Sequence, residues 1–388
     1  MRIAHLHFAP VLALCTLASV GTVAGAQEID WKKVAGRRSS RRRPHAGDGR
    51  SRAGRTPRWY VACLIALAAV SFAMDRPLAQ APEPLLLQLE GKIPLGDVSG
   101  RIDHMAIDLP RRRLFVAELG NDSVAVVDIN ERKVQHVITG LKQPQGLGYV
   151  PSNDTLFVAN AGDGSVRLFR GADYAESGSI DLGEDADNIR VDAASNRVFV
   201  GYGRGGLAEI DPATNGKVLD LPLPAHPEGF QLARSVRRIF VNLPKARMIA
   251  VIDRFAGKQV ASWPVDNESF FPMALDEQFG RILVAFRNPA RLGVFSMQDG
   301  SNIATFDACG DSDDLFVDAK RHRIYQSCGD GHLDVFEVDG DAYRRSAHIQ
   351  TISGGRTALF VPEIDRLFVA ARGNPGEPAA IWIFRPTP

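Results

Sequence analysis

The hexapeptide Arg-Arg-Leu-Phe-Val-Ala at residues 112–117 recurs near the end of the chain as Asp-Arg-Leu-Phe-Val-Ala at residues 365–370. Five further variants of this phrase lie between the two, each with a large hydrophobic residue in the same place. The seven equivalent residues are Phe115, Phe157, Phe199, Phe240, Leu283, Tyr325 and Phe368, at intervals of 41 to 43 residues. A nearly constant period in this range is typical of a repeat architecture. Residues from about 85 to 388 are therefore expected to form one repeating object.

Each repeat unit has the pattern of four short strands. In the first unit, residues 105–108, 114–118, 124–127 and 134–139 are rich in β-branched and apolar residues and are separated by polar turns. No segment after Leu85 sustains the period of an amphipathic helix, which excludes a helical solenoid. Four strands in a unit of about 40–45 residues form the blade of a β-propeller. The sequence predicts an all-β, seven-bladed propeller over residues 82–388.

The seventh unit lacks a fourth strand, since few residues follow Trp382. Ahead of the first unit, residues 85–95 resemble the fourth strands of other units, such as residues 178–182. We expect this N-terminal segment to complete the last blade by pairing beside the strand of Trp382. Such pairing removes an exposed sheet edge that would otherwise favour aggregation.

The repeat resembles a known family. Residues 156–166, Leu-Phe-Val-Ala-Asn-Ala-Gly-Asp-Gly-Ser-Val, and the parallel residues 114–124 are similar to the YVTN-type β-propeller repeat. The third-strand endings at 127–128, 210–212 and 252–253 match the same pattern. The resemblance covers about residues 85–388 and implies a secreted or surface propeller. It implies no particular chemistry, because a fold does not determine a function.

Residues 1–81 contain two segments that resemble export signals. Residues 1–26 combine Arg2, an apolar run and small residues at a cleavage position, and residues 59–81 combine an apolar run, preceded by Arg55 and Arg58, with a similar cleavage position. The basic stretch 37–58 lies between them, and cleavage after Ala26 would place it outside the membrane, against the positive-inside tendency. We therefore expect export through the second signal to the periplasm or the extracellular space. Residues 1–58 are then an upstream extension from a misassigned start. The alternative is that residues 60–74 are retained as a membrane anchor.

The charge of the chain is divided unevenly. Residues 1–80 hold 13 Lys/Arg and 4 Asp/Glu, which leaves 33 basic and 41 acidic residues and a net charge of −8 for the rest. A net acidic propeller argues against nucleic acid as a partner. The expected partner is an unknown protein or a small polar ligand, with membrane contact only through an uncleaved N-terminal segment.

Two cysteines belong to the propeller. Cys309 precedes the first strand of the sixth unit and Cys328 ends its second strand, so antiparallel pairing places both at the same end of the blade. Export provides an oxidising compartment, and we therefore predict a disulfide between them. The alternative is a pair of free, partly buried thiols. The absence of Cys-x-x-Cys spacing argues against a metal site made by these two residues alone.

Aligned repeats place polar residues at the start of each innermost strand, where the strands of a propeller surround the axial channel. The candidates for this axial mouth are Asp103, His104, Gln145, Asp187, Asn188, His226, Glu228, Asp313, Asp314 and Arg356. Collected at one concave site, these groups suit a small polar ligand or a divalent cation. A divalent cation is the only cofactor that the sequence suggests. The alternative is that they are ordinary loop residues that hold only water. His332 is expected on the same face, where it could join His104 or His226 around a metal.

No motif identifies a catalytic centre. The sequence has no Gly-x-Ser-x-Gly nucleophile elbow, no phosphate loop and no His-Glu-x-x-His. We therefore expect a binding scaffold without catalytic machinery. The alternative is a metal-dependent hydrolase of lactone or ester type that uses the acidic axial mouth.

Overall fold

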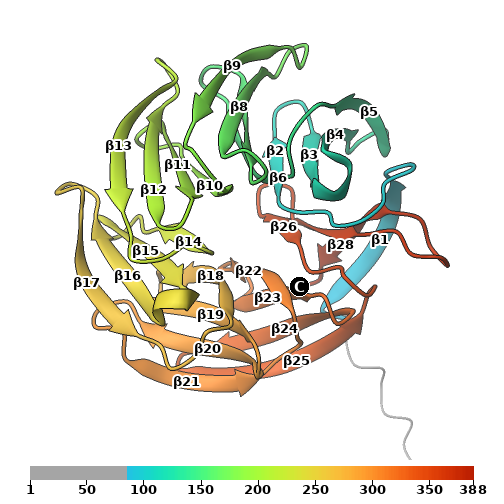
Figure 1. The fold of residues 1–388 in the computed structure, drawn as a ribbon. Helices are drawn as coiled ribbons and strands as arrows, with labels where there is room; N and C mark the ends of the chain where they lie inside the picture. The colour runs from blue at the N-terminus through green and yellow to red at the C-terminus, as the bar shows by residue number, and fades with distance from the viewer. Residues whose placement is uncertain (1–84) are drawn as a thin grey trace, which may run out of the picture. The chain divides into compact units, whose positions relative to one another are not determined.

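The structure, a computed structural model, describes residues 85–388, and the expected export segments lie outside the described residues. Within that range the strands form seven four-stranded sheets, which are arranged as blades around a central axis (Figure 1). Neighbouring strands within every sheet are antiparallel, as the register of β2 against β3 illustrates. The predicted all-β, seven-bladed propeller is confirmed.

Blades are numbered in chain order. Blade one contains β2 (Met105–Asp108), β3 (Arg113–Glu118), β4 (Ser123–Asp128) and β5 (Lys133–Ile138). Blade two contains β6 (Pro144–Val150), β7 (Thr155–Asn160), β8 (Ser165–Arg170) and β9 (Glu176–Asp181). Blade three contains β10 (Ala186–Asp192), β11 (Arg197–Tyr202), β12 (Gly206–Asp211) and β13 (Gly216–Pro222). Blade four contains β14 (Phe230–Leu232), β15 (Arg238–Leu243), β16 (Met248–Asp253) and β17 (Lys258–Pro264).

The remaining blades follow the same plan. Blade five contains β18 (Phe270–Asp276), β19 (Arg281–Arg287), β20 (Ala290–Ser296) and β21 (Asn302–Asp307). Blade six contains β22 (Ser312–Asp318), β23 (Arg323–Cys328), β24 (His332–Asp339) and β25 (Ala342–Gln350). Blade seven contains β26 (Ala358–Val361), β27 (Arg366–Ala371), β28 (Ala380–Pro386) and β1 (Leu87–Pro94). Two single 3₁₀ turns, η2 (Leu119–Asn121) and η3 (Pro244–Ala246), follow β3 and β15. No helix in the described residues is long and apolar enough to cross a membrane.

The repeated hydrophobic residue packs one blade against the next. Phe115 of β3 is fully buried in a cluster with Leu147 and Tyr149 of blade two, and its ring centroid lies 5.7 Å from that of Tyr149. Tyr325 of blade six meets Phe360 of blade seven in the same way, with centroids 5.2 Å apart. Burial of an aromatic side chain on both sides is a large stabilising contribution. This shared role explains why the position recurs in all seven units.

Blade seven is built from both ends of the described chain. Its strand order is β1-β28-β27-β26, and β1 runs antiparallel to β28 with Lys92 opposite Trp382. The Lys92 ammonium lies 3.6 Å from the centroid of the Trp382 ring, a cation–π contact. The blade therefore has four strands although residues 358–388 supply only three.

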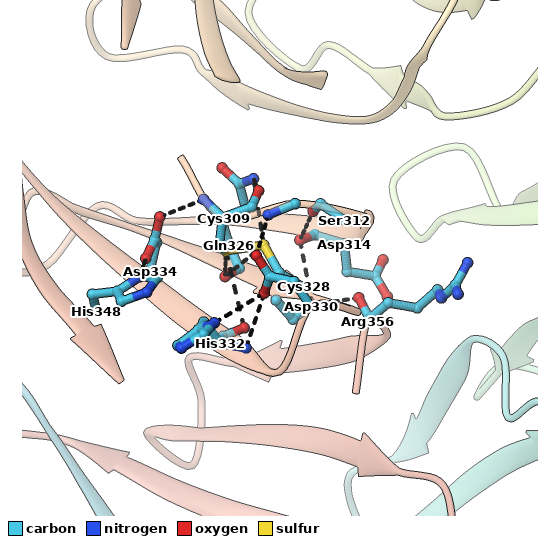
Figure 2. Close-up of a disulfide and its surroundings, with 12 residues drawn as sticks. Cys309, Ser312, Asp314, Gln326, Cys328, Asp330, His332, Asp334, His348 and Arg356 are labelled. Atoms are coloured by element: carbon cyan, nitrogen blue, oxygen red, sulfur yellow. Dashed lines mark hydrogen bonds and ion pairs between the residues drawn. A yellow bond between two sulfur atoms is a disulfide. The ribbon is translucent and has the colours of Figure 1, made fainter. Parts of the chain in front are cut away.

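Cys309 and Cys328 form the predicted disulfide, with their Cα atoms 5.8 Å apart. Figure 2 shows that the bridge lies beside the start of β22, next to Ser312 and Asp314. The amide of Cys309 donates a hydrogen bond of 2.7 Å to Asp334 of β24. The bridge and this bond together attach the segment that leads into β22 to the middle of blade six.

Candidate functional site

The starts of the innermost strands enclose a cavity of about 560 Å³ on the axis. The predicted residues that line it are His104, Gln145, Asp187, Asn188, His226, Glu228, Asp313 and Asp314. Asp103 and Arg356 lie directly behind this wall, where Asp103 contacts Arg101 and Arg356 contacts Asp313. The structure thus brings the ten candidates together, and whether they bind a ligand stays a prediction.

Irregular pairing at the strand starts presents these side chains to the cavity. The register between the first two strands shifts between Ala186 and Ile189 in blade three and between Ser312 and Asp314 in blade six. Similar shifts occur in blades two and five. A bulge leaves a residue outside the ladder and redirects its side chain. Asp187 and Asp313 occupy such unpaired positions, which is why they can face the axis.

Close contact between neighbouring blades also shapes the wall. A Cβ atom on Gly146 would lie 1.9 Å from the carbonyl oxygen of Asp187, and one on Gly229 would lie 2.4 Å from that of Phe271. The amide of Gly229 donates a 3.0 Å hydrogen bond to the same Phe271 carbonyl. Only glycine permits backbones to approach this closely. The two glycines therefore bring the backbones of adjacent blades together beside the cavity.

One polar cluster links blades one and six. His104 Nδ1 lies 3.4 Å from Asp314 Oδ2, and its Nε2 lies 3.7 Å from Asp103 Oδ1. Burial opposes the charged imidazolium, but the attraction of Asp314 and Asp103 outweighs it and raises the pKa of His104 to about 9. His104 is therefore a cation at neutral pH.

Asp103 is the most deeply buried carboxylate of this cluster. Its side chain is 1% exposed, and Arg101 Nη2 lies 2.8 Å from Oδ2. That ion pair lacks hydrogen-bond geometry, so neither oxygen of Asp103 has a hydrogen-bond partner among the described residues. Burial raises the pKa of Asp103 to about 6, although His104 and Arg101 oppose the shift.

A second cluster lies between blades three and four. His226 Nε2 is 3.6 Å from Asp187 Oδ2, and its Nδ1 contacts the carbonyl oxygen of Gly203. Burial opposes protonation, but Asp187, the Gly203 carbonyl and Glu228 raise the pKa of His226 to about 9. Burial and the nearby charge of Asp187 raise the pKa of Glu228 to about 7.

Arginines of blades five and seven supply positive charge in and beside the cavity. Arg287 Nη2 donates to Asp313 Oδ1, and the guanidinium stacks 3.8 Å from the centroid of the Phe271 ring. Arg356 pairs with Asp311 at 2.7 Å and lies 3.7 Å from Asp313 Oδ2. Burial raises the pKa of Asp313, and Arg287 is the largest opposing influence. Asp313 Oδ2 is buried without a hydrogen-bond partner in the described part of the chain.

Several cavity residues escaped the sequence analysis. Arg101, Asp185, Arg190, Lys245 and Arg287 line the cavity as well. Arg287 ends β19, and the ends of second strands meet the starts of innermost strands at the same edge of each blade. A charged residue at the end of a second strand, such as Arg287, could therefore have been predicted to line the cavity by aligning the repeats at that position as well. Lys245 lies in the η3 turn, and among the described blades only blade one has an equivalent 3₁₀ turn. Alignment of the repeats therefore could not predict that Lys245 lines the cavity.

The expected role of His332 near the axial histidines is wrong. Its ring stacks on that of His348, with centroids 4.0 Å apart, and its Nδ1 lies 3.2 Å from Asp330. Figure 2 shows this pair on the blade, beside the disulfide. The turn at residues 329–332 carries His332 toward the outer strand β25 because His332 starts β24 and pairs opposite Gln350.

The fold and the cavity define a seven-bladed β-propeller with a polar axial cavity of mixed charge. The chain is similar to a structure of hydrazine synthase from Kuenenia stuttgartiensis, with a TM-score of 0.56 and 15% identity over 73% of this chain and 96% of that one. It is also similar to the WD40 repeats of RRP9, with a TM-score of 0.67 and 9% identity over 79% of this chain and 99% of the other. At such identities these structures share the fold alone. No protein-family model and no curated protein sequence matches the chain, so its relation to the YVTN-type repeat stays a prediction.

Proposed function

We propose that the protein is an exported binding propeller whose axial cavity takes a small polar ligand that carries charge of both signs. The observation that carries this proposal is a cavity walled by both signs of charge, in which Asp313 holds a buried carboxylate oxygen without a hydrogen bond in the described residues. Unsatisfied buried carboxylates cost free energy, which a bound ligand or ordered water would offset. A cavity of about 560 Å³ is in the size range of small-molecule sites.

The arrangement of charge within the cavity favours a ligand with two kinds of polar group. Asp187 and Glu228 come from blades three and four, and Arg287 with its stacked Phe271 comes from blade five. An amino group of the ligand would be attracted to the carboxylates, and a carboxylate of the ligand to the arginine. A loop of a partner protein could present an amino group and a carboxylate in the same way. The proposal therefore includes a protein loop as an alternative to a free small molecule.

A thermal-shift screen of the purified full-length protein tests the binding proposal. The probes are amino acids, polyamines and dicarboxylates, all in the presence of EDTA. At least one should raise the melting temperature in proportion to its concentration. The shift should be lost in Arg287→Gln and kept in Arg344→Gln, because Arg344 is exposed and pairs with Glu337, outside the cavity. No shift with any probe, or an equal shift in Arg287→Gln, would contradict a small-molecule site.

A metal-dependent hydrolase of lactone or ester type is the second candidate. It is favoured by the crowding of Asp187, His226 and Glu228, whose candidate ligand atoms all lie within 4.8 Å of one another. Aryl esters and lactones incubated with the protein, with Zn²⁺ or Ca²⁺ and with EDTA, test this candidate. Absence of turnover under every condition would rule out these reactions and leave the binding proposal intact.

A further inference from the structure

Three potential metal ligands meet at one point of the cavity wall. Asp187 comes from β10, and His226 and Glu228 come from the segment between β13 and β14. One atom of each lies within 4.8 Å of the other two. We propose that these three side chains bind a divalent transition-metal cation, of which Zn²⁺ is the best match. This deepens the proposed function, because the cation would occupy the same cavity as the ligand.

The orientation of His226 suits a metal ligand. Its Nδ1 faces two acceptors, the Gly203 carbonyl oxygen and Asp185 Oδ2 at 3.5 Å, so that nitrogen carries a hydrogen. Nε2 is the nitrogen that faces Asp187. Metal-bound histidines commonly donate their other N–H to a carbonyl or carboxylate, which fixes the ring. The surroundings of His226 therefore direct Nε2 toward the proposed cation.

Asp187 provides an independent reason to expect a cation. Its side chain is 10% exposed, and no hydrogen bond reaches its carboxylate from residues 85–388. His226 Nε2 lies 3.6 Å from its Oδ2. A carboxylate that is nine-tenths buried without a donor is costly, and a bound cation would satisfy it. Two ligands of one tetrahedral zinc lie about 3.3 Å apart, close to the observed separation.

Two arginines of the cavity are paired with other carboxylates. Arg287 pairs with Asp313 and Asp311, and Arg101 pairs with Asp103. Within the described residues, neither Asp187 nor Glu228 forms an ion pair with an arginine or a lysine. The two carboxylates are therefore free of fixed arginine or lysine partners and are available to a cation from solution.

The ligand set selects the kind of metal. One imidazole nitrogen and two carboxylates are typical ligands of Zn²⁺, whereas Ca²⁺ and Mg²⁺ prefer oxygen ligands alone. Three protein ligands would leave a tetrahedral ion with one position open toward the cavity. An oxygen atom of the cavity ligand could occupy that position.

Metal binding is tested directly on the tag-free, EDTA-treated full-length protein. Titration with Zn²⁺ should show one equivalent bound and a rise in melting temperature that Ca²⁺ at the same concentration does not give. His226→Gln and Glu228→Gln should each weaken Zn²⁺ binding at least tenfold. His332→Gln, which changes a histidine outside the cavity that also contacts a carboxylate, should bind like the parent protein.

Two results would overturn the metal site. One is the absence of a Zn²⁺-dependent shift in the parent protein, and the other is undiminished binding in both cavity variants. Melting curves of the metal-free variants show whether each variant is folded. If His226→Gln or Glu228→Gln does not fold, Asp187→Asn is titrated with Zn²⁺ in its place. The probe screen in EDTA measures the organic ligand without metal, so failure of one proposal is distinguishable from failure of the other.

Discussion

Nδ1 of His104 in blade one lies 3.4 Å from Oδ2 of Asp314 in blade six, and the same oxygen accepts a 2.9 Å hydrogen bond from the amide of Ala358 in blade seven. One carboxylate therefore joins the first blade to the last two beside the axis. An ion pair at this closing point of the ring contributes to the stability of the whole propeller, because the ring closes only when these blades meet.

The His104–Asp314 pair predicts how stability depends on pH. The pKa of His104 is about 9 in the folded protein and about 6.5 when unperturbed. A raised pKa stabilises the fold fully below pH 6.5, and this stabilisation is lost as the pH rises to 9. At about 1.4 kcal/mol per pKa unit, the loss is up to about 3 kcal/mol. Urea unfolding between pH 6.5 and 9 should show the decline, and His104→Gln should reduce it without removing it, because the pKa of His226 is also about 9. An equal decline in His104→Gln would show that other groups cause it.

Asp103 is expected to lower stability at neutral pH. Its pKa is about 6 in the folded protein, above the ordinary value of 3.8, so folding favours its protonated form and stability falls as the pH rises from 4 to 6. Asp103→Asn removes the buried charge at constant shape. We expect the variant to be more stable than the parent by up to about 3 kcal/mol at pH 8 and unchanged near pH 4. Asp266→Asn, at an almost fully exposed position, is the control and should change stability little at either pH.

The fold was predictable because its main packing interaction repeats. Phe115 and its six equivalents occupy the same buried place between blades. The need for a large hydrophobic residue there therefore appears seven times in the sequence. The axial site was partly predictable, since closing the ring brings the starts of all innermost strands together. Asp187 and Glu228 could therefore be assigned to one cavity although they lie in different units.

The rest of the site depends on details that the repeat does not encode. Asp103 and His104 are adjacent, yet only His104 lines the cavity, whereas both members of the equivalent pair in blade three line it. The pairing of Asp313 with Arg287 depends on how closely blades five and six approach. Such distances follow from packing between particular side chains, and a pattern of residue types cannot supply them.

The disulfide should stabilise both blade six and the cavity. Cys309 and Cys328 are 19 residues apart, and a loop of this length corresponds to about 3 kcal/mol in the chain-entropy model. Cys309→Ser with Cys328→Ser should lower the melting temperature, and dithiothreitol should lower that of the parent but not that of the double variant. An unchanged melting temperature in the double variant would mean that the hydrogen bond from the Cys309 amide to Asp334 suffices to hold the segment.

Gly146 tests whether close contact between blades determines the shape of the cavity. An added Cβ would lie 1.9 Å from the Asp187 carbonyl oxygen, and backbone on both sides leaves no flexible side chain to move away. We expect Gly146→Ala to destabilise the protein by about 3 kcal/mol or more, as overpacking and backbone shifts do.

Gly178 provides the matched control for this substitution. It lies in the outer strand β9, where an added Cβ meets only Asn215 Nδ2 at 3.9 Å. Gly178→Ala should be neutral or slightly stabilising, since alanine reduces the conformational freedom of the unfolded chain. Because Asp187 is also a proposed zinc ligand, Gly146→Ala should weaken Zn²⁺ binding and Gly178→Ala should not. Equal stability and equal zinc affinity in the two variants would show that blades two and three separate at no cost, and that the wall of the cavity is not held by their contact.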